Sequence, residues 1–207
     1  MKKPIVSALK RLSVLRSDAP LLLFFLTAAA GTFCGALSSQ AADAGTLKRL
    51  DFLFLTNFEL RCTQSVISAF IASFSSVTVF MLAAFLLGLS LWGCALCAAV
   101  PFFRGYGYGL TAGYICSAYG MNGFFYSLLV LLPGMFISCA ALSFAALCSF
   151  KSSIGSVMHL MRSPVKDDPR ARLRSYTLQM LRLMLVCAVS SLTDTLCSLS
   201  FSWLFRF

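Results

Sequence analysis

The chain contains few charged residues, and acidic ones are the scarcest among them. Of 207 residues only 12% are charged, with 7 acidic side chains against 17 basic ones and a single histidine. A soluble domain carries about 25% charged residues, whereas 59% of this chain is hydrophobic. The composition therefore excludes an ordinary soluble domain and indicates an integral membrane protein.

The chain also lacks long polar segments. No loop is long enough for a soluble catalytic domain, and no group of side chains matches a catalytic, metal or cofactor site, so we expect neither an enzyme nor a cofactor. The basic residues stand beside apolar runs rather than along an exposed helix face with aromatic partners, which excludes a nucleic-acid partner. Beside a membrane they act as topology signals, and we expect them to attract anionic lipid at the cytoplasmic face.

Cysteine is the one reactive residue that is common. Nine cysteines are present, but nearly all fall within apolar runs, where cysteine behaves as a small hydrophobic residue. Only Cys34 and Cys62 fall where an oxidising compartment could reach them. Cys94 and Cys97 form a C-x-x-C pair deep in apolar sequence without a nearby base, so packing is the favoured interpretation.

Five apolar segments are candidate membrane spans, since about 20 residues cross about 30 Å of hydrocarbon. Pro101 interrupts the apolar pattern after the second segment, and the third segment is short and rich in glycine. The five ranges are 21–37, 77–100, 105–119, 124–150 and 177–204.

Lysine and arginine indicate which side of the membrane each loop faces. They gather in the N-terminal segment 1–19, at Arg104 between the second and third spans, and in a loop at about 151–175. Short loops rich in basic residues face the cytoplasm. We therefore predict an all-α polytopic membrane protein with about five transmembrane helices and a cytoplasmic N-terminus. It divides into the basic segment 1–19 and a single membrane domain, 20–207.

Three segments each admit two interpretations. The first span is similar to a cleaved secretory signal, with a basic start and small residues at 38–44, but its length and the spacing of Gly31 and Gly35 favour retention. The segment 47–62 is either an interfacial amphipathic helix or a loop packed on the bundle. The segment 63–78 either lengthens the second span or re-enters the membrane.

Glycine is concentrated at 104–123, which reads RGYGYGLTAGYICSAYGMNG. A phosphate-binding loop is excluded, because no strand precedes the glycines and no Lys-Ser/Thr pair follows them. GYGYG is similar to the filter of potassium channels, but the glycines continue at four-residue spacing, which is typical of helices packed closely in lipid. The glycines expected at such packing faces are Gly31 and Gly35 in the first span and Gly105, Gly109 and Gly113 in the third.

Two further features shape the third and fourth spans. Asn122 and Gly123 follow Met121 and are suited to the positive φ of a tight turn. Pro133 interrupts the apolar pattern of the fourth span. We predict that Asn122-Gly123 connects the two spans and that Pro133 shapes the fourth.

Asp194 is the acidic residue expected within a span. An acidic side chain at the centre of a transmembrane helix costs about 2.5–3.5 kcal/mol and marks a functional site by default. Serines and threonines surround it, so it is either a buried polar anchor or an interfacial residue where the span ends early. His159, the only histidine, has no neighbours at metal-ligand spacing.

The stretch FFRGYGYGLTAGYICSAYGMNGFFYSLLVLLPGMF at 102–136 resembles the stage II sporulation protein M family. That family shares a short glycine-rich span, a small turn and an apolar span broken by Leu-Pro. Gly134 and Ser138 depart from the pattern, since many wider family members carry a histidine and a glutamate there. The matching residues are Phe103, Gly105, Gly109, Gly113, Gly123, Leu132 and Pro133.

The resemblance implies a non-enzymatic membrane scaffold of endospore formation. In that family the protein anchors two peptidoglycan-degrading partners, stage II sporulation proteins D and P, for septal thinning and engulfment. It implies a multi-pass protein of the cell membrane at the sporulation septum. The alternative that the residues leave open is a small transporter or permease-like subunit, because spans interrupted by Gly and Pro are typical of transporter helices.

Overall fold

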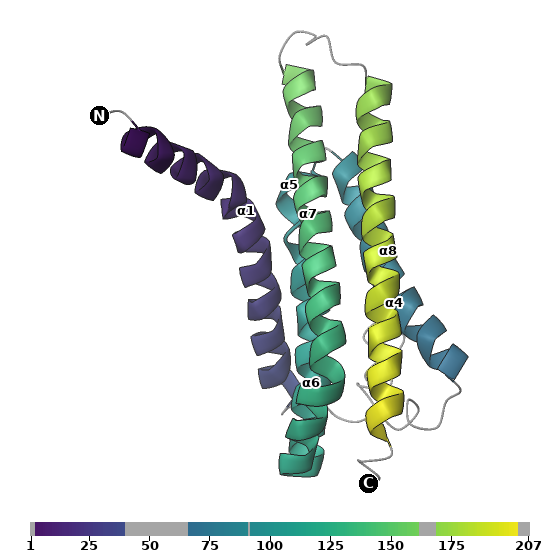
Figure 1. Cartoon of the computed structure of the whole chain (residues 1–207). Helices are drawn as coiled ribbons and strands as arrows, with labels where there is room; N and C mark the ends of the chain where they lie inside the picture. The colour runs from purple at the N-terminus through teal and green to yellow at the C-terminus, as the bar shows by residue number, and fades with distance from the viewer. Residues whose placement is uncertain (1–2, 40–65, 91, 162–168, 203–207) are drawn as a thin grey trace.

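In a computed structural model, the residues described are 3–39, 66–90, 92–161 and 169–202, and they form helices without a strand (Figure 1). The all-α class predicted from the sequence is confirmed for these ranges. The elements are α1 (Lys3–Ser38), α4 (Val66–Leu89), α5 (Gly93–Leu96), α6 (Ala99–Tyr126), the π-helical η2 (Ser127–Leu131), α7 (Leu132–Met161) and α8 (Pro169–Ser202).

Four stretches of the described residues are long and apolar enough to cross a membrane, which indicates a multi-pass membrane protein. The third stretch has 63 residues, about three times the length of one crossing. Its chain reverses direction near Gly120, which has a φ of 55° (Figure 1). The four stretches are Pro20–Ser38, Val66–Leu89, Gly93–Gly155 and Leu173–Ser198.

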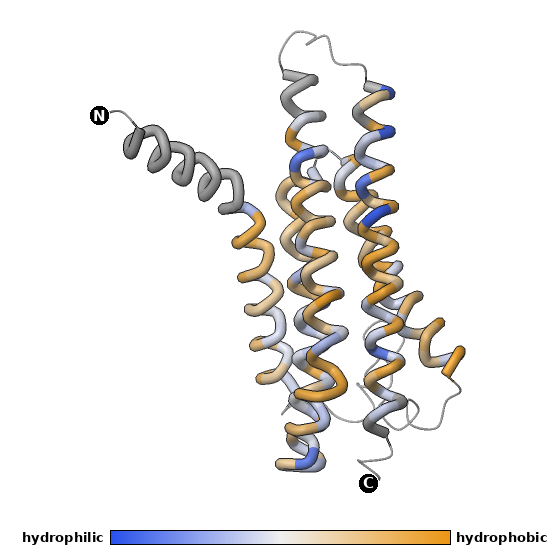
Figure 2. The backbone as a smooth tube through the Cα atoms, in the orientation of Figure 1, coloured by the Kyte–Doolittle hydropathy of each residue, from blue (hydrophilic) through white to orange (hydrophobic). Residues whose placement is uncertain are grey.

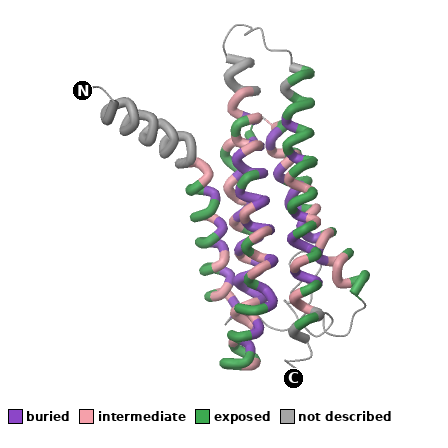
Figure 3. Tube along the Cα trace, in the orientation of Figure 1, coloured by how far each residue is buried: buried purple, intermediate pink, exposed green. Residues whose placement is uncertain are grey.

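The helices form two packing groups that share α7. In one group α1 lies against α6, and α7 contacts both of them. In the other group α4, α7 and α8 pack on one another. Purple buried segments in Figure 3 lie where these helices face each other, with green exposed residues on the outside. Orange apolar residues cover much of that outside, and blue residues lie toward the upper end of α8 (Figure 2). This pattern is the one expected where lipid surrounds the bundle.

The second apolar span ends earlier than the sequence predicts. Helix α4 stops at Leu89, the short α5 follows, and Pro101 lies in the first turn of α6. Proline is tolerated in a first helical turn, where its missing N–H has no intrahelical partner. The apolar run at 77–100 therefore belongs to three helices, because hydropathy alone does not register a short turn between them.

The structure also decides one of the open interpretations for the residues that it describes. Residues 66–78 continue into α4 as one helix, so this part of the Ser/Thr-rich segment lengthens the second span. The basic segment at 151–175 is shorter as a loop than predicted, since α7 extends to Met161 and α8 starts at Pro169. The segment 47–62 lies outside the described residues.

Candidate functional site

Helices α1 and α6 run in the same direction and touch through their backbones at four glycines. A methyl group at Gly31 would collide with the Phe102 carbonyl, and one at Gly109 would lie 2.8 Å from the Thr32 carbonyl carbon. Gly35 and Gly105 meet backbone atoms of the facing helix in the same way. A side chain at any of these positions would force the two helices apart, which is why small residues occupy such interfaces in lipid.

Gly113 lies one turn further along the same face of α6. Its nearest neighbour is the Ser39 hydroxyl, and the Ala36 carbonyl oxygen lies 3.0 Å from the position of an added methyl. The structure therefore brings all five glycines named from the sequence to one interface between α1 and α6, which we call the glycine seam.

The chain reversal differs from the predicted turn. The positive φ belongs to Gly120, whereas Asn122 and Gly123 lie in the helical segment after it, and Gly123 packs against Ile115. The predicted turn at Asn122-Gly123 is therefore wrong by two to three residues. Gly120 and Gly123 both suit a turn in sequence, and only the structure shows that Gly123 is needed for close packing against Ile115.

Pro133 follows a local widening of the helix. Residues Ser127–Leu131 form the π-helical turn η2, and the Leu132 N–H donates to the Ser127 carbonyl. Pro133 has no N–H to donate, and π-turns are one of the ways in which a helix accommodates such a break. Pro133 thus lies at the junction of η2 and α7 rather than ending a helix.

Arg104 lies inside the bundle and is only 2% exposed. Its Nη1 donates to Ser76 Oγ and its Nη2 to the Tyr108 hydroxyl, each at 2.8 Å. The guanidinium carbon also stands 4.6 Å from the centre of the Tyr108 ring and 5.5 Å from that of Phe80. Its Nε has no hydrogen-bond partner in the described part of the chain. The sequence-based placement of Arg104 in a cytoplasmic loop is therefore wrong.

Asp194 is buried as well, with 5% of its surface exposed. Ser73 Oγ donates to its Oδ2 at 3.1 Å, and its carboxylate lies directly against Gly134. Ser190, on the same helix, donates to the Gly134 carbonyl at 2.9 Å. Of the two interpretations left open by the sequence, the structure supports the buried polar anchor.

The two buried charges are held by neighbouring serines of α4, among polar residues from four helices. Ser73 and Ser76 stand one turn apart on α4 and hold Asp194 and Arg104, respectively. This group of residues, named here the polar core, consists of Ser73, Ser76, Arg104, Tyr108, Ser138 and Asp194, with Ser138 donating to the Tyr108 hydroxyl at 3.1 Å.

Sequence reasoning missed most of the polar core. A basic residue three positions after a proline and between two apolar runs has the same pattern as a loop arginine. Two signals were available: Arg104 and Tyr108 have the four-residue spacing of helix neighbours, and Ser73 and Ser76 interrupt an apolar helix on one face. Neither signal shows by itself that the two pairs meet.

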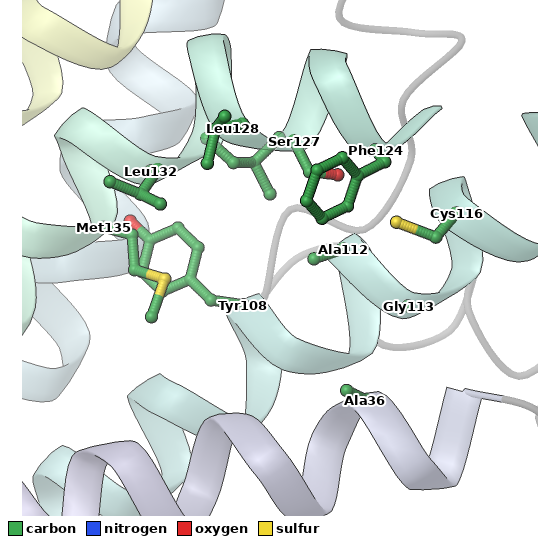
Figure 4. A pocket seen from close by; sticks show the side chains of 11 residues that line it. Ala36, Tyr108, Ala112, Gly113, Cys116, Phe124, Ser127, Leu128, Leu132 and Met135 are labelled. Carbon is green, nitrogen blue, oxygen red and sulfur yellow. The ribbon is translucent and has the colours of Figure 1, made fainter. Parts of the chain in front are cut away.

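A cavity of about 350 Å³ borders the polar core. It lies between the end of α1, the middle of α6 and the segment around η2, and the Tyr108 ring forms part of its wall (Figure 4). Its lining is almost entirely apolar. The lining residues are Ala36, Tyr108, Ala112, Gly113, Cys116, Phe124, Ser127, Leu128, Leu131, Leu132 and Met135.

The remaining candidates do not join this site. The cysteines whose side chains are described, Cys34, Cys94 and Cys97 among them, carry free thiols, and no three His, Cys, Asp or Glu side chains gather at metal-binding distance among the residues searched. Cys62 lies outside the described residues, as does the side chain of His159.

Comparisons with protein-family models, with curated proteins and with solved structures found no match to this chain.

Proposed function

We propose that the protein is a five-pass membrane scaffold of endospore formation. In this proposal it has no catalytic activity of its own and anchors peptidoglycan-degrading partners, the stage II sporulation proteins D and P, at the septum. The observation that carries the proposal is the glycine seam. Gly105, Gly109 and Gly113, three of the residues in the resembling stretch, contact α1 across this seam, so the resembling residues serve to hold a rigid helix pair together.

The 63-residue stretch supports five passes, because it is long enough for two crossings and reverses near Gly120. The parallel run of α1 and α6 supports this count, since odd-numbered crossings share a direction. Arg170 and Arg174 at the start of α8 are exposed, which favours the cytoplasm for that end of the bundle. Labelling of single cysteines introduced near Ser90 and near Met121 in intact cells tests the orientation, with only the second expected to react with an impermeant reagent.

Deletion of the gene in its native host tests the sporulation role directly. Cells induced to sporulate are stained with a membrane dye, and the expected phenotype is a septum that forms but is not engulfed. Complementation by the Gly109→Leu variant should fail, whereas Ala118→Leu, which adds a side chain to the exposed surface of the same helix, should restore engulfment. Normal engulfment in the deletion strain contradicts the proposal.

Partner binding needs its own measurement. The tagged chain is purified in a mild detergent from sporulating cells, and stage II sporulation proteins D and P are probed in the eluate. Their recovery with the wild-type chain and their loss with Gly109→Leu are expected. Absence of both from the wild-type eluate, with the chain itself intact, contradicts the anchoring role.

The second candidate is a small transporter or permease-like subunit, and one observation favours it. Arg104 and Asp194 are both buried among helices that are long and apolar enough to span a membrane, and intramembrane charges often line ion or proton paths. Proteoliposomes loaded with a pH-sensitive dye test this function. Proton flux that is lost in Asp194→Asn supports transport, and flux equal to that of empty liposomes argues for the scaffold.

A further inference from the structure

Helix α8 has a buried face and an outward face between Tyr176 and Leu196. Tyr176, Met180, Cys187 and Asp194 recur at helical spacing and are buried. The opposite face is a row of exposed leucines, completed by Val189, which is the surface expected against lipid chains. This leucine row consists of Leu178, Leu181, Leu185, Leu192 and Leu196.

Polar residues run beside the leucine row into the span. Ser175, Gln179 and Arg182 are exposed and follow one another at spacings of four and three residues, so they lie on one side of the helix. Arg182 lies nine residues after Leu173, where the apolar span begins, which is about 13 Å along the helix axis. An exposed cation therefore stands well inside the apolar surface.

The two longer polar side chains have no partner among the residues that the structure describes. Neither Gln179 nor Arg182 makes a hydrogen bond or ion pair with the residues that the structure describes. Asp194, the one carboxylate whose side chain is described, lies on the opposite, buried face of α8. A guanidinium without a counter-charge is costly in hydrocarbon, and no described residue supplies one to Arg182.

The direction in which side chains extend from a helix indicates where a counter-charge for Arg182 can come from. Side chains on a helix lean toward its N-terminus, so the guanidinium of Arg182 extends back toward Gln179 and the start of the span. A long arginine side chain can snorkel in that direction, toward the level at which lipid headgroups meet the acyl chains. Ser175 and Gln179 add a hydroxyl and an amide at the same level, groups that hydrogen-bond to phosphate and glycerol oxygens.

We propose that Arg182, Gln179 and Ser175 bind the headgroup of an anionic phospholipid, with the phosphate on the Arg182 guanidinium and an acyl chain along the leucine row. Arg170 and Arg174, both exposed just outside or at the start of the span, raise the local concentration of anionic lipid. The inference rests on the proposed membrane placement and assigns a site to the anionic lipid expected at the cytoplasmic face. A second copy of the chain is disfavoured on this surface, since it would bring the same cations together.

The test uses the full chain purified in a neutral detergent and titrated with phosphatidylglycerol or phosphatidylcholine, with bound lipid counted by native mass spectrometry. The wild-type chain is expected to retain phosphatidylglycerol selectively. Arg182→Gln should weaken that binding by about tenfold or more, as expected for loss of a charge-assisted contact. Arg170→Gln removes the same charge outside the span and should weaken it by at most about fivefold.

One further variant and a stability control complete the experiment. Arg182→Lys keeps the charge and should retain most of the binding, and equal melting temperatures of all variants exclude a loss of fold as the cause. Equal retention of the two lipids, or equal effects of Arg182→Gln and Arg170→Gln, overturns the proposal. Binding of inorganic phosphate with the same affinity, or a dimer that Arg182→Gln dissociates, also overturns it. None of these readouts depends on sporulation, so failure here is separate from failure of the scaffold role.

Discussion

Replacing Gly109 by alanine adds a single methyl group at the centre of the glycine seam. That methyl would lie 2.8 Å from the carbonyl carbon and 2.9 Å from the Cα of Thr32, both backbone atoms of α1. Carbon atoms in contact are ordinarily about 3.5–4.0 Å apart. Helix α1 therefore has to retreat from α6 by roughly 1 Å, since no flexible side chain can give way.

The size of the effect follows from two opposing terms. A gap of about 0.5–1 Å forfeits a quarter to a half of the dispersion energy at each contact, and overpacking of this kind costs about 1–3 kcal/mol. The higher helix propensity of alanine over glycine stabilises the helix by about 1 kcal/mol. We expect a net loss of up to about 2 kcal/mol in the free energy of unfolding, so a gain in stability would contradict the packing.

Unfolding of the purified chain by SDS in mixed micelles, followed by circular dichroism, measures this free energy. Ala118→Leu on the exposed side of α6 is the matched control and should change it by less than about 0.5 kcal/mol. A Gly109→Ala variant that is more stable than the wild-type chain would refute the close backbone contact, because helix propensity would then be the only term left.

Three further predictions use the same unfolding measurement. Arg104→Met and Asp194→Asn should each destabilise the chain by about 1.5–3 kcal/mol, since each removes hydrogen bonds to a buried charged group. The double variant should lose at least about 1 kcal/mol less than the sum, and strict additivity would show that the two charges are independent. Tyr176→Phe removes the hydroxyl that lies 3.0 Å from the Phe85 carbonyl oxygen and should cost about 1 kcal/mol; an unchanged midpoint would argue against that bond. Gly120→Ala should lower the free energy of unfolding by about 1–3 kcal/mol, because φ is 55° at this position and nothing lies within 4 Å of the added methyl to cause a clash. A gain in stability would rule out the strained turn.

The helical class and the glycine seam could be predicted because each depends on a local pattern. Long apolar runs specify membrane helices by length alone, and glycines at four-residue spacing mark one helix face wherever the partner lies. The identity of the partner helix was not available from the spacing. The sequence predicts a packing face at Gly31 and Gly35, but only the structure places this face opposite Phe102 and Tyr106.

Helix ends and buried charges were harder to predict, for a common reason. Hydropathy averages over many residues, so the turn between Leu89 and Gly93 disappears within an apolar run. The same averaging assigns Arg104 to a loop, because one cation near Pro101 resembles the end of a span. Its burial depends on partners far away in the sequence, and Ser76 and the Tyr108 hydroxyl become visible as partners only once the helices are packed.

Gly134 and Ser138, the two residues at which the resemblance seen in the sequence fails, both lie at the polar core. Gly134 lies directly against the Asp194 carboxylate, where a side chain on Gly134 would collide with it, and Ser138 donates to the Tyr108 hydroxyl. A large residue at 134 would therefore displace Asp194. In this chain α7 provides space and one hydroxyl, while α6 and α8 provide the charges. Any ionic role of the bundle centre must then be carried by Arg104 and Asp194, which makes these two residues the ones that separate the scaffold from the transporter.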